Sequence, residues 1–153
     1  MILINFIYFC LILPIIYKGR PIYSIDIHPD NNKFATGSLG LCKNSINSIH
    51  KPNCLLDSKI KIWSFIPLQN RENDVESENR LISTLVSHTG GVNSVRWSKS
   101  GTYLASGSDD QTVIIWEKKV GPGGKVFGRN EVNIENWWPK SILQGHTGGI
   151  FNF

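Results

Sequence analysis

The sequence lacks several features that would point at once to a particular chemistry. Its 16 Lys and Arg residues are scattered and form no basic block, so the net charge of +4 does not by itself indicate nucleic-acid binding. Neither a recognition helix nor a zinc-finger pattern is visible, which argues against direct reading of DNA sequence. A Gly-x-Ser-x-Gly elbow is also missing, so the sequence does not carry that signature of a nucleophilic hydrolase.

Cysteine is scarce and irregularly placed. The three cysteines, Cys10, Cys42 and Cys54, are odd in number, which suits a reduced intracellular compartment better than a disulfide framework. Cys42 and Cys54 lie near His50, but a structural zinc site needs four ligands and no fourth is close. We therefore predict no metal site and no cofactor.

Residues 1–17 lack any charged side chain. As a signal peptide this segment has no basic start and no small-residue cleavage site; as a membrane span it falls short of about 20 residues and contains Pro14. We interpret it as a buried strand or as misassigned coding sequence, with a secretion signal or membrane anchor as the alternative.

The composition favours an all-β chain with a packed core. Apolar residues make up 41% of the sequence and aromatic residues 10%, including 5 Trp, while 14 Gly and 7 Pro punctuate it at the frequency that short strands and turns require. In the stretch GTYLASGSDDQTVIIWEKK, a strand, a tight turn at residues 109–111 and a β-branched strand predict a hairpin. The preceding residues 91–97 predict one more strand.

The same order of strands and turns occurs upstream, so the chain contains a repeat. Residues 25–27, 34–38 and 57–63 align with residues 95–97, 104–108 and 110–116. In each copy an Asp stands six positions before a Trp, as Asp57 before Trp63 and Asp110 before Trp116. A third copy begins at Gly145-His146, where the motif Ser87-His88-Thr89-Gly90-Gly91 recurs.

These units resemble the WD40 repeats of β-propellers, whose usual length is about 40–45 residues. Trp63 and Trp116 stand 53 positions apart, and we expect loops to contain the excess. The resemblance implies two four-stranded blades plus the first strand of a third, in a seven-bladed ring. The expected boundaries are 18–86 for the first blade, with an insertion at 41–56 and a polar loop at 67–80, 87–144 for the second, with a loop at 120–138, and 145–153 for the start of the third.

In WD repeats a His, a Ser or Thr, an Asp and a Trp form one hydrogen-bonded chain. The second copy matches at every position, with His88, Ser106, Asp110 and Trp116, so we expect a complete structural tetrad there. A catalytic triad of Ser106, His88 and Asp110 is the rejected alternative, because the Ser lies within a strand.

The tetrad of the first copy is expected to be incomplete. Thr36, Asp57 and Trp63 match, but the His position falls near residues 17–18. In the third copy only His146 is present. We predict that these sets hold structure and perform no catalysis.

Three segments together resemble the amino-terminal propeller of the HIRA/Hir family of histone chaperone subunits. They are GRPIYSIDIHPDNNKFATG, HTGGVNSVRWSKSGTYLASGSDDQTVIIWEKK and GPGGKVFGRNEVNIENWWPKSILQGH, the last with an Asn-x-Glu-x-Trp element at Asn133, Glu135 and Trp137. The resemblance covers residues 19–153 without the 41–56 insertion. We therefore expect the chain to be a fragment of a longer protein, with residues 1–17 and 41–56 as errors of the gene assignment.

The resemblance implies a nuclear, non-enzymatic scaffold for replication-independent nucleosome assembly and transcriptional regulation. The implied partners are a ubinuclein-like subunit and histones, with no small-molecule substrate and no membrane. Two alternatives stay open: the WD-repeat subunit of chromatin assembly factor, which is replication-coupled, and a generic WD-repeat adaptor in ubiquitin ligation or RNA processing.

Overall fold

The fold is all-β in a computed structural model that describes residues 22–38, 58–65, 81–122, 124 and 133–153. The strands are β1 (Ile22–Ile27), β2 (Lys33–Ser38), β3 (Lys59–Ser64), β4 (Leu81–Val86), β5 (Val92–Trp97), β6 (Tyr103–Ser108), β7 (Val113–Pro122) and β8 (Glu135–Leu143). Within these ranges there is no helix that could cross a membrane. The expected His position of the first repeat, Asp57, Cys42, His50 and Cys54 lie outside the described residues.

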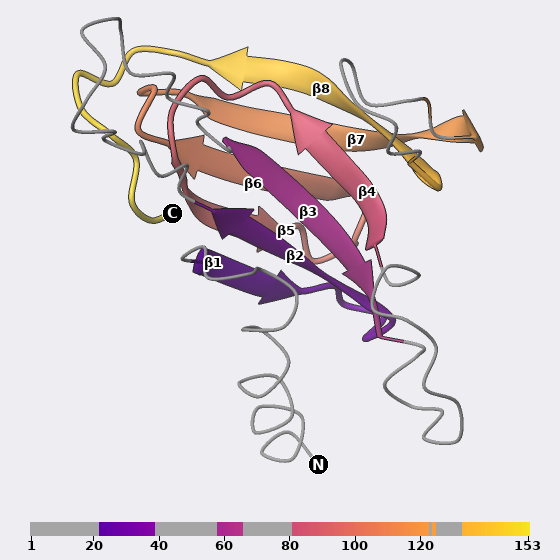
Figure 1. Cartoon of the computed structure of the whole chain (residues 1–153). Helices are drawn as coiled ribbons and strands as arrows, with labels where there is room; N and C mark the ends of the chain where they lie inside the picture. Colours follow the sequence, from indigo (N-terminus) through magenta and orange to yellow (C-terminus); the bar gives the residue numbers. More distant parts are fainter. Residues whose placement is uncertain (1–21, 39–57, 66–80, 123, 125–132) are drawn as a thin grey trace, which may run out of the picture.

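The strands form two antiparallel four-stranded sheets with the same topology (Figure 1). One sheet has the order β1-β2-β3-β4 and the other β5-β6-β7-β8, so each strand pairs with its neighbour in sequence. The first hairpins share a register, with Ile27 opposite Phe34 in one and Trp97 opposite Leu104 in the other. The all-β, WD-type fold class is therefore confirmed, and the expected seven-bladed ring stays a prediction.

The turns that open the two sheets are also equivalent. In the first, the Asn31 N–H donates to His28 O at 2.8 Å, and in the second the Gly101 N–H donates to Ser98 O at 2.9 Å. Asn31 has φ 54° and Gly101 has φ 71°, a left-handed conformation that Asn and Gly tolerate best. The sequence thus supplies the residue types that these turns require.

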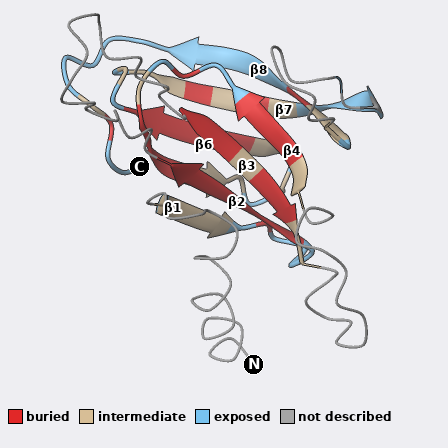
Figure 2. Ribbon diagram, in the orientation of Figure 1, coloured by how far each residue is buried: buried red, intermediate tan, exposed pale blue. Residues whose placement is uncertain are grey.

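The main core lies between the two sheets, where β5 packs against β1 and β2 (Figure 2). Gly37 permits a close approach of the sheets, because a Cβ there would lie 2.9 Å from the Val92 side chain. Each large apolar side chain in this core contributes roughly 1.5–3 kcal/mol through burial. The buried members are Ala35, Ile60, Ile62, Leu85, Val92, Val95, Leu104, Ile114, Trp116 and Trp137.

The predicted loop at 120–138 is too long, because its two ends belong to strands. β7 continues to Pro122, and β8 begins at Glu135, with Lys118 opposite Trp137 and Pro122 opposite Glu135. The hairpin extends because register shifts at residues 115–116 and 119–122 let the two arms stay paired. Pro139 is accommodated because β8 is an edge strand within the described sheet.

Residues 145–153, the expected first strand of a third repeat, form no strand. A strand needs a ladder partner, and no described strand pairs with this segment. The segment nevertheless lies on the second sheet, because the Ile150 N–H donates to Ser108 O at 3.0 Å. A Cβ at Gly107 would lie 2.7 Å from the Ile150 side chain and 2.8 Å from Phe153, which repeats the contact of Gly37 with Val92.

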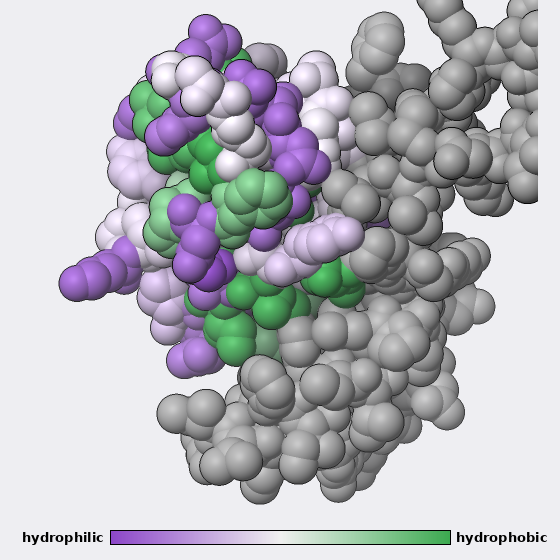
Figure 3. Space-filling view, turned by 90° about the vertical axis from the view of Figure 1, so that its left-hand side faces the viewer, coloured by the Kyte–Doolittle hydropathy of each residue, from purple (hydrophilic) through white to green (hydrophobic). Residues whose placement is uncertain are grey.

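Apolar side chains also lie at the surface of both sheets. Tyr23 on β1 is 53% exposed, Leu143 on β8 is 52% exposed, and Phe151 is 72% exposed. In the side view of Figure 3, hydrophobic residues lie among hydrophilic ones on the described surface. Both sheets therefore present apolar surface in addition to the core that they share.

Candidate functional site

The second sheet contains the predicted set of four side chains in one hydrogen-bonded chain. The Trp116 indole N–H donates to Ser106 Oγ at 2.9 Å, and Ser106 Oγ lies 2.7 Å from His88 Nε2. His88 Nδ1 lies 2.9 Å from Asp110 Oδ2. The set connects β7, β6, the segment before β5 and the β6–β7 turn, so it ties the sheet together through side chains.

The direction of these bonds follows from the Asp110 carboxylate. Burial alone would raise the pKa of Asp110, but hydrogen bonds from the Thr112 side chain, the Thr89 N–H and His88 lower it to about 2. An ionised carboxylate only accepts, so His88 Nδ1 carries a proton, and in the neutral imidazole Nε2 then accepts from Ser106. In this series each group donates to the next, from Trp116 through Ser106 and His88 to Asp110.

The same order of Ser, His and Asp occurs in hydrolase triads, and the burial of Ser106 separates the two cases. Ser106 is 0% exposed and lies within β6. Its oxygen already accepts from Trp116, and a second contact to Ile114 O is 3.4 Å long. The hydroxyl is closed off from solvent, so a substrate would have no access to it in this arrangement.

The first sheet repeats the inner part of this set. The Trp63 indole N–H donates to Thr36 Oγ1 at 3.0 Å, and Thr36 Oγ1 donates to Lys61 O at 3.4 Å. Thr36 and Trp63 are therefore brought together, whereas Asp57 lies outside the described residues. The stabilising role of both sets stays a prediction.

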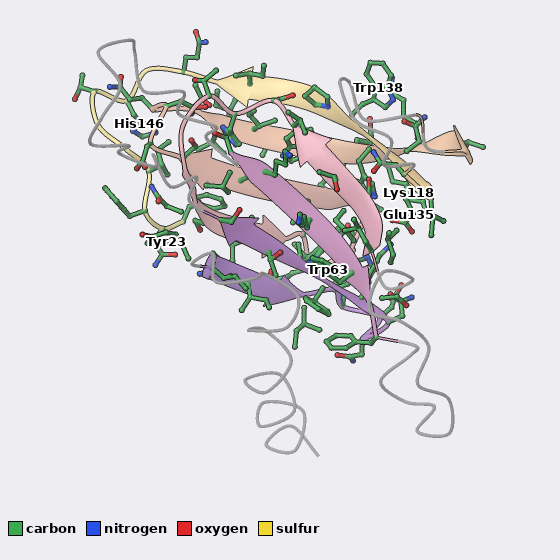
Figure 4. The ribbon with its side chains drawn as sticks, in the orientation of Figure 1. Tyr23, Trp63, Lys118, Glu135, Trp138 and His146 are labelled. Atoms are coloured by element: carbon green, nitrogen blue, oxygen red, sulfur yellow. The ribbon has the colours of Figure 1, made fainter. Side chains whose placement is uncertain are left out.

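His146 takes a different position from His88. It is exposed and lies in the segment after β8, at the end of the molecule that carries the C-terminus (Figure 4). His88 by contrast is 5% exposed between Asp110 and Ser106. The structure therefore does not bring His146 into a tetrad with described residues.

A row of polar bonds between the sheets was not predicted from the sequence. The Val95 N–H donates to Ser24 Oγ at 3.1 Å, and the Trp97 N–H donates to Asp26 Oδ2 at 2.6 Å. Ser24 and Asp26 are two residues apart on β1, so their side chains share one face. That alternation is the signal that could have indicated a polar face turned towards β5.

The turns of the two sheets also meet. His28 Nε2 lies 3.0 Å from Gly101 O, while the Asp30 N–H donates to His28 Nδ1 at 3.2 Å. The His28 ring packs edge-on against Trp97, with ring centroids 4.8 Å apart. These contacts fix one end of the sheet pair, as Ser24 and Asp26 fix its middle.

Comparison with known families matches this pattern of paired blades. The WD domain, G-beta repeat family matches residues 14–64 and 79–117. The chain belongs to the WD-repeat family. Its two described sheets are thus WD blades, and the tetrad of the second blade occupies the positions that the repeat predicts.

Curated relatives of this WD-repeat chain are named HIR1 and HIRA. Protein HIR1 of Cryptococcus neoformans var. neoformans serotype D is 42% identical over 130 residues, which are 84% of this chain and 13% of that protein. Protein HIRA of Homo sapiens is 38% identical over 143 residues, 89% of this chain and 12% of that protein. The resemblance to the HIRA/Hir family is confirmed, and the chain spans about an eighth of these relatives' length.

Among solved structures, that of U3-55K aligns with 86% of this chain and 28% of its own chain. The identity is 18% and the TM-score is 0.49.

Proposed function

We propose that this chain is part of a non-enzymatic WD-repeat scaffold in a nuclear histone chaperone complex. The scaffold would serve replication-independent nucleosome assembly and transcriptional regulation, with a ubinuclein-like subunit and histones as its partners. The observation that carries the proposal is identity of 38–42% to HIRA and HIR1 across 84–89% of the chain. Similarity of that extent covers the connecting segments as well as the WD positions.

The geometry agrees with a docking platform. The one Ser-His-Asp set among the described residues has a fully buried serine, which leaves no reactive hydroxyl at the surface. The polar bonds between the blades hold their strands in a fixed arrangement. A rigid pair of blades presents its loops and edges in constant positions, which suits protein recognition.

Affinity purification with mass spectrometry tests this function. The full-length gene product is tagged at its carboxy terminus, and an unrelated WD-repeat protein with the same tag serves as the control for general propeller binding. We expect a ubinuclein-like subunit and histones to be enriched with the gene product and not with the control protein. Enrichment of ubiquitin ligase or RNA-processing subunits, or of replication-fork proteins, would contradict the proposal.

A further inference from the structure

The Asn-x-Glu-x-Trp element lies where the two blades meet. Residues 133–137 lead into β8 of the second blade, yet many of their contacts are with the first. Asn133 Oδ1 accepts from the Thr84 N–H at 2.8 Å, and Asn133 Nδ2 donates to Thr84 O at 3.2 Å. The Ile134 N–H donates to Ile82 O at 2.8 Å. The element therefore occupies hydrogen-bonding groups on the outer edge of β4, an edge that would otherwise be open to another strand.

Glu135 continues the contact with a buried ion pair. Lys33 Nζ, from β2 of the first blade, donates to Glu135 Oε1 at 2.9 Å and to Oε2 at 3.2 Å. The Lys33 and Glu135 side chains are 10% and 15% exposed, so solvent screens this pair less than a surface pair. The Glu135 backbone carbonyl also accepts from Ser83 Oγ at 3.1 Å.

Two indoles complete the surroundings of the Lys33 ammonium. Its nitrogen lies 5.9 Å from the Trp97 ring centroid and 5.7 Å from the Trp137 ring centroid, within the range of a cation–π contact. The rings meet edge to face, 5.4 Å apart at 67°. The Trp137 N–H donates to Glu135 Oε2 at 2.8 Å, which holds the carboxylate in place.

Glu135 has a second lysine partner at the surface. Lys118 Nζ, from β7, donates to Glu135 Oε1 at 2.7 Å, and the two residues lie together beside β4 in Figure 4. Burial alone would raise the pKa of Glu135, but bonds from Lys118, Lys33 and Trp137 hold it below its usual range. The carboxylate is thus charged at neutral pH and available to both lysines.

We propose that residues 133–137 and Trp97 form an inter-blade latch, a lysine-receiving cage of two indoles and one carboxylate that the first blade fills with Lys33. The latch fixes the position of the second blade against β4. The latch is particular to this junction, because the second blade has Tyr103 at the position of Lys33. The equivalence follows from the turns: the His28 N–H donates to Lys33 O in the first blade, and the Ser98 N–H donates to Tyr103 O in the second. Repeat proteins gain stability from such neighbour contacts in addition to the stability of each repeat.

Hydrogen exchange measured by NMR on the full chain tests the latch through the Thr84 amide. We expect Lys33→Met and Asn133→Ala each to speed exchange of that amide at least about tenfold, while the Ser106 amide in β6 keeps its rate. Lys119→Met is the matched control for the lysine, because Lys119 lies 5.4 Å from the Trp138 centroid within a single blade. Asn136→Ala is the control for the amide, since the Asn136 side chain accepts from the Trp138 N–H at 2.6 Å, within β8 itself.

A double-mutant cycle separates a cage from two independent contacts. If Lys33 and Glu135 act as one unit, Lys33→Met combined with Glu135→Gln should speed Thr84 exchange no more than the stronger single change. The latch would be overturned if the two changes multiplied each other's effect on the Thr84 exchange rate. It would also be overturned if neither Lys33→Met nor Glu135→Gln alone changed that rate. Should Lys33→Met unfold the chain, Glu135→Gln still decides, because it removes the carboxylate charge that receives Lys33 and leaves the Asn133 contact with Thr84 in place.

Discussion

Trp116 and Ser106 form the central bond of the second blade, with the indole N–H 2.9 Å from the hydroxyl oxygen. Both residues are almost fully buried, so neither group has water as an alternative partner. The bond from Trp63 to Thr36 in the first blade has nearly the same length, 3.0 Å. The two blades therefore use one device at equivalent positions, and its energetic weight can be tested.

Removing the indole N–H alone should lower stability by a moderate amount. Trp116→Phe keeps most of the apolar volume but leaves Ser106 Oγ without its donor, so we expect a loss of about 1–2 kcal/mol in the free energy of unfolding. Trp116→Ala should cost about 3–5 kcal/mol because it also opens a cavity. Trp138→Phe is the control, since Trp138 is 54% exposed and should change stability by less than about 0.5 kcal/mol. Equal effects of the two Phe variants in urea unfolding would exclude a role for the buried bond.

Asp110 should be the most sensitive carboxylate of the second blade. Its oxygens accept from His88, the Thr89 N–H and both the N–H and the hydroxyl of Thr112. Asp110→Ala removes these acceptors together, and we expect a loss of about 3 kcal/mol in thermal or denaturant unfolding.

The neighbouring Asp109 supplies the matched control for that variant. It accepts one side-chain bond, from Asn93 at 2.6 Å, so Asp109→Ala should cost about 1 kcal/mol. A larger loss for Asp109→Ala than for Asp110→Ala would mean that the tetrad is not what holds the turn.

Acid should weaken the second blade through Asp110. Its pKa is about 2 in the folded chain, against an ordinary value of 3.8, so the unfolded chain binds the proton more readily. The resulting stabilisation, ~2 kcal/mol, is fully present above pH 4 and is lost as the pH falls from about 4 to about 2. Denaturant unfolding across this range should show the loss, and Asp110→Asn should reduce it. An identical pH dependence in the Asn variant would show that other groups are responsible.

Gly101 should resist substitution because of both its conformation and its neighbour. Its φ of 71° is unfavourable for a residue with a side chain, and a Cβ there would lie 2.5 Å from the His28 ring. We expect Gly101→Ala to cost about 2–3 kcal/mol in the free energy of unfolding. Gly148→Ala is the control, since a Cβ there meets nothing within 4 Å, and it should be neutral. A neutral Gly101→Ala would show that the His28 contact is dispensable.

Strands and turns could be predicted from the sequence because their signals are local. The alternation around Leu104 and the turn at Asp110 each span a few residues. The repeat shows the same order of strands and turns a second time, which supports the same prediction. The loop predicted at 120–138 took in the first residues of β8 because Pro139 and two adjacent Trp residues resemble a loop. The pairing of β8 depends on register shifts in β7 that no local pattern indicates.

The contacts between the blades could not be predicted from local patterns. Ser24 and Val95 are 71 positions apart, His28 and Gly101 are 73 apart, and Lys33 and Glu135 are 102 apart. Such pairs join residues of different blades, so no local pattern indicates them. The family resemblance singled out Glu135 and Trp137 as unusual, and the structure gives them a physical reason, since both lie at the junction with the first blade.

Cross-linking mass spectrometry on the captured complex tests whether these two blades dock a ubinuclein-like subunit. A lysine-reactive cross-linker is applied to the full-length gene product with its co-purified partners, and cross-links from Lys99, Lys119 and Lys140 of the second blade are mapped. We expect links from this part of the chain to a ubinuclein-like subunit. Links that connect the ubinuclein-like subunit only to parts of the gene product outside this chain would contradict the claim that these blades form the docking platform.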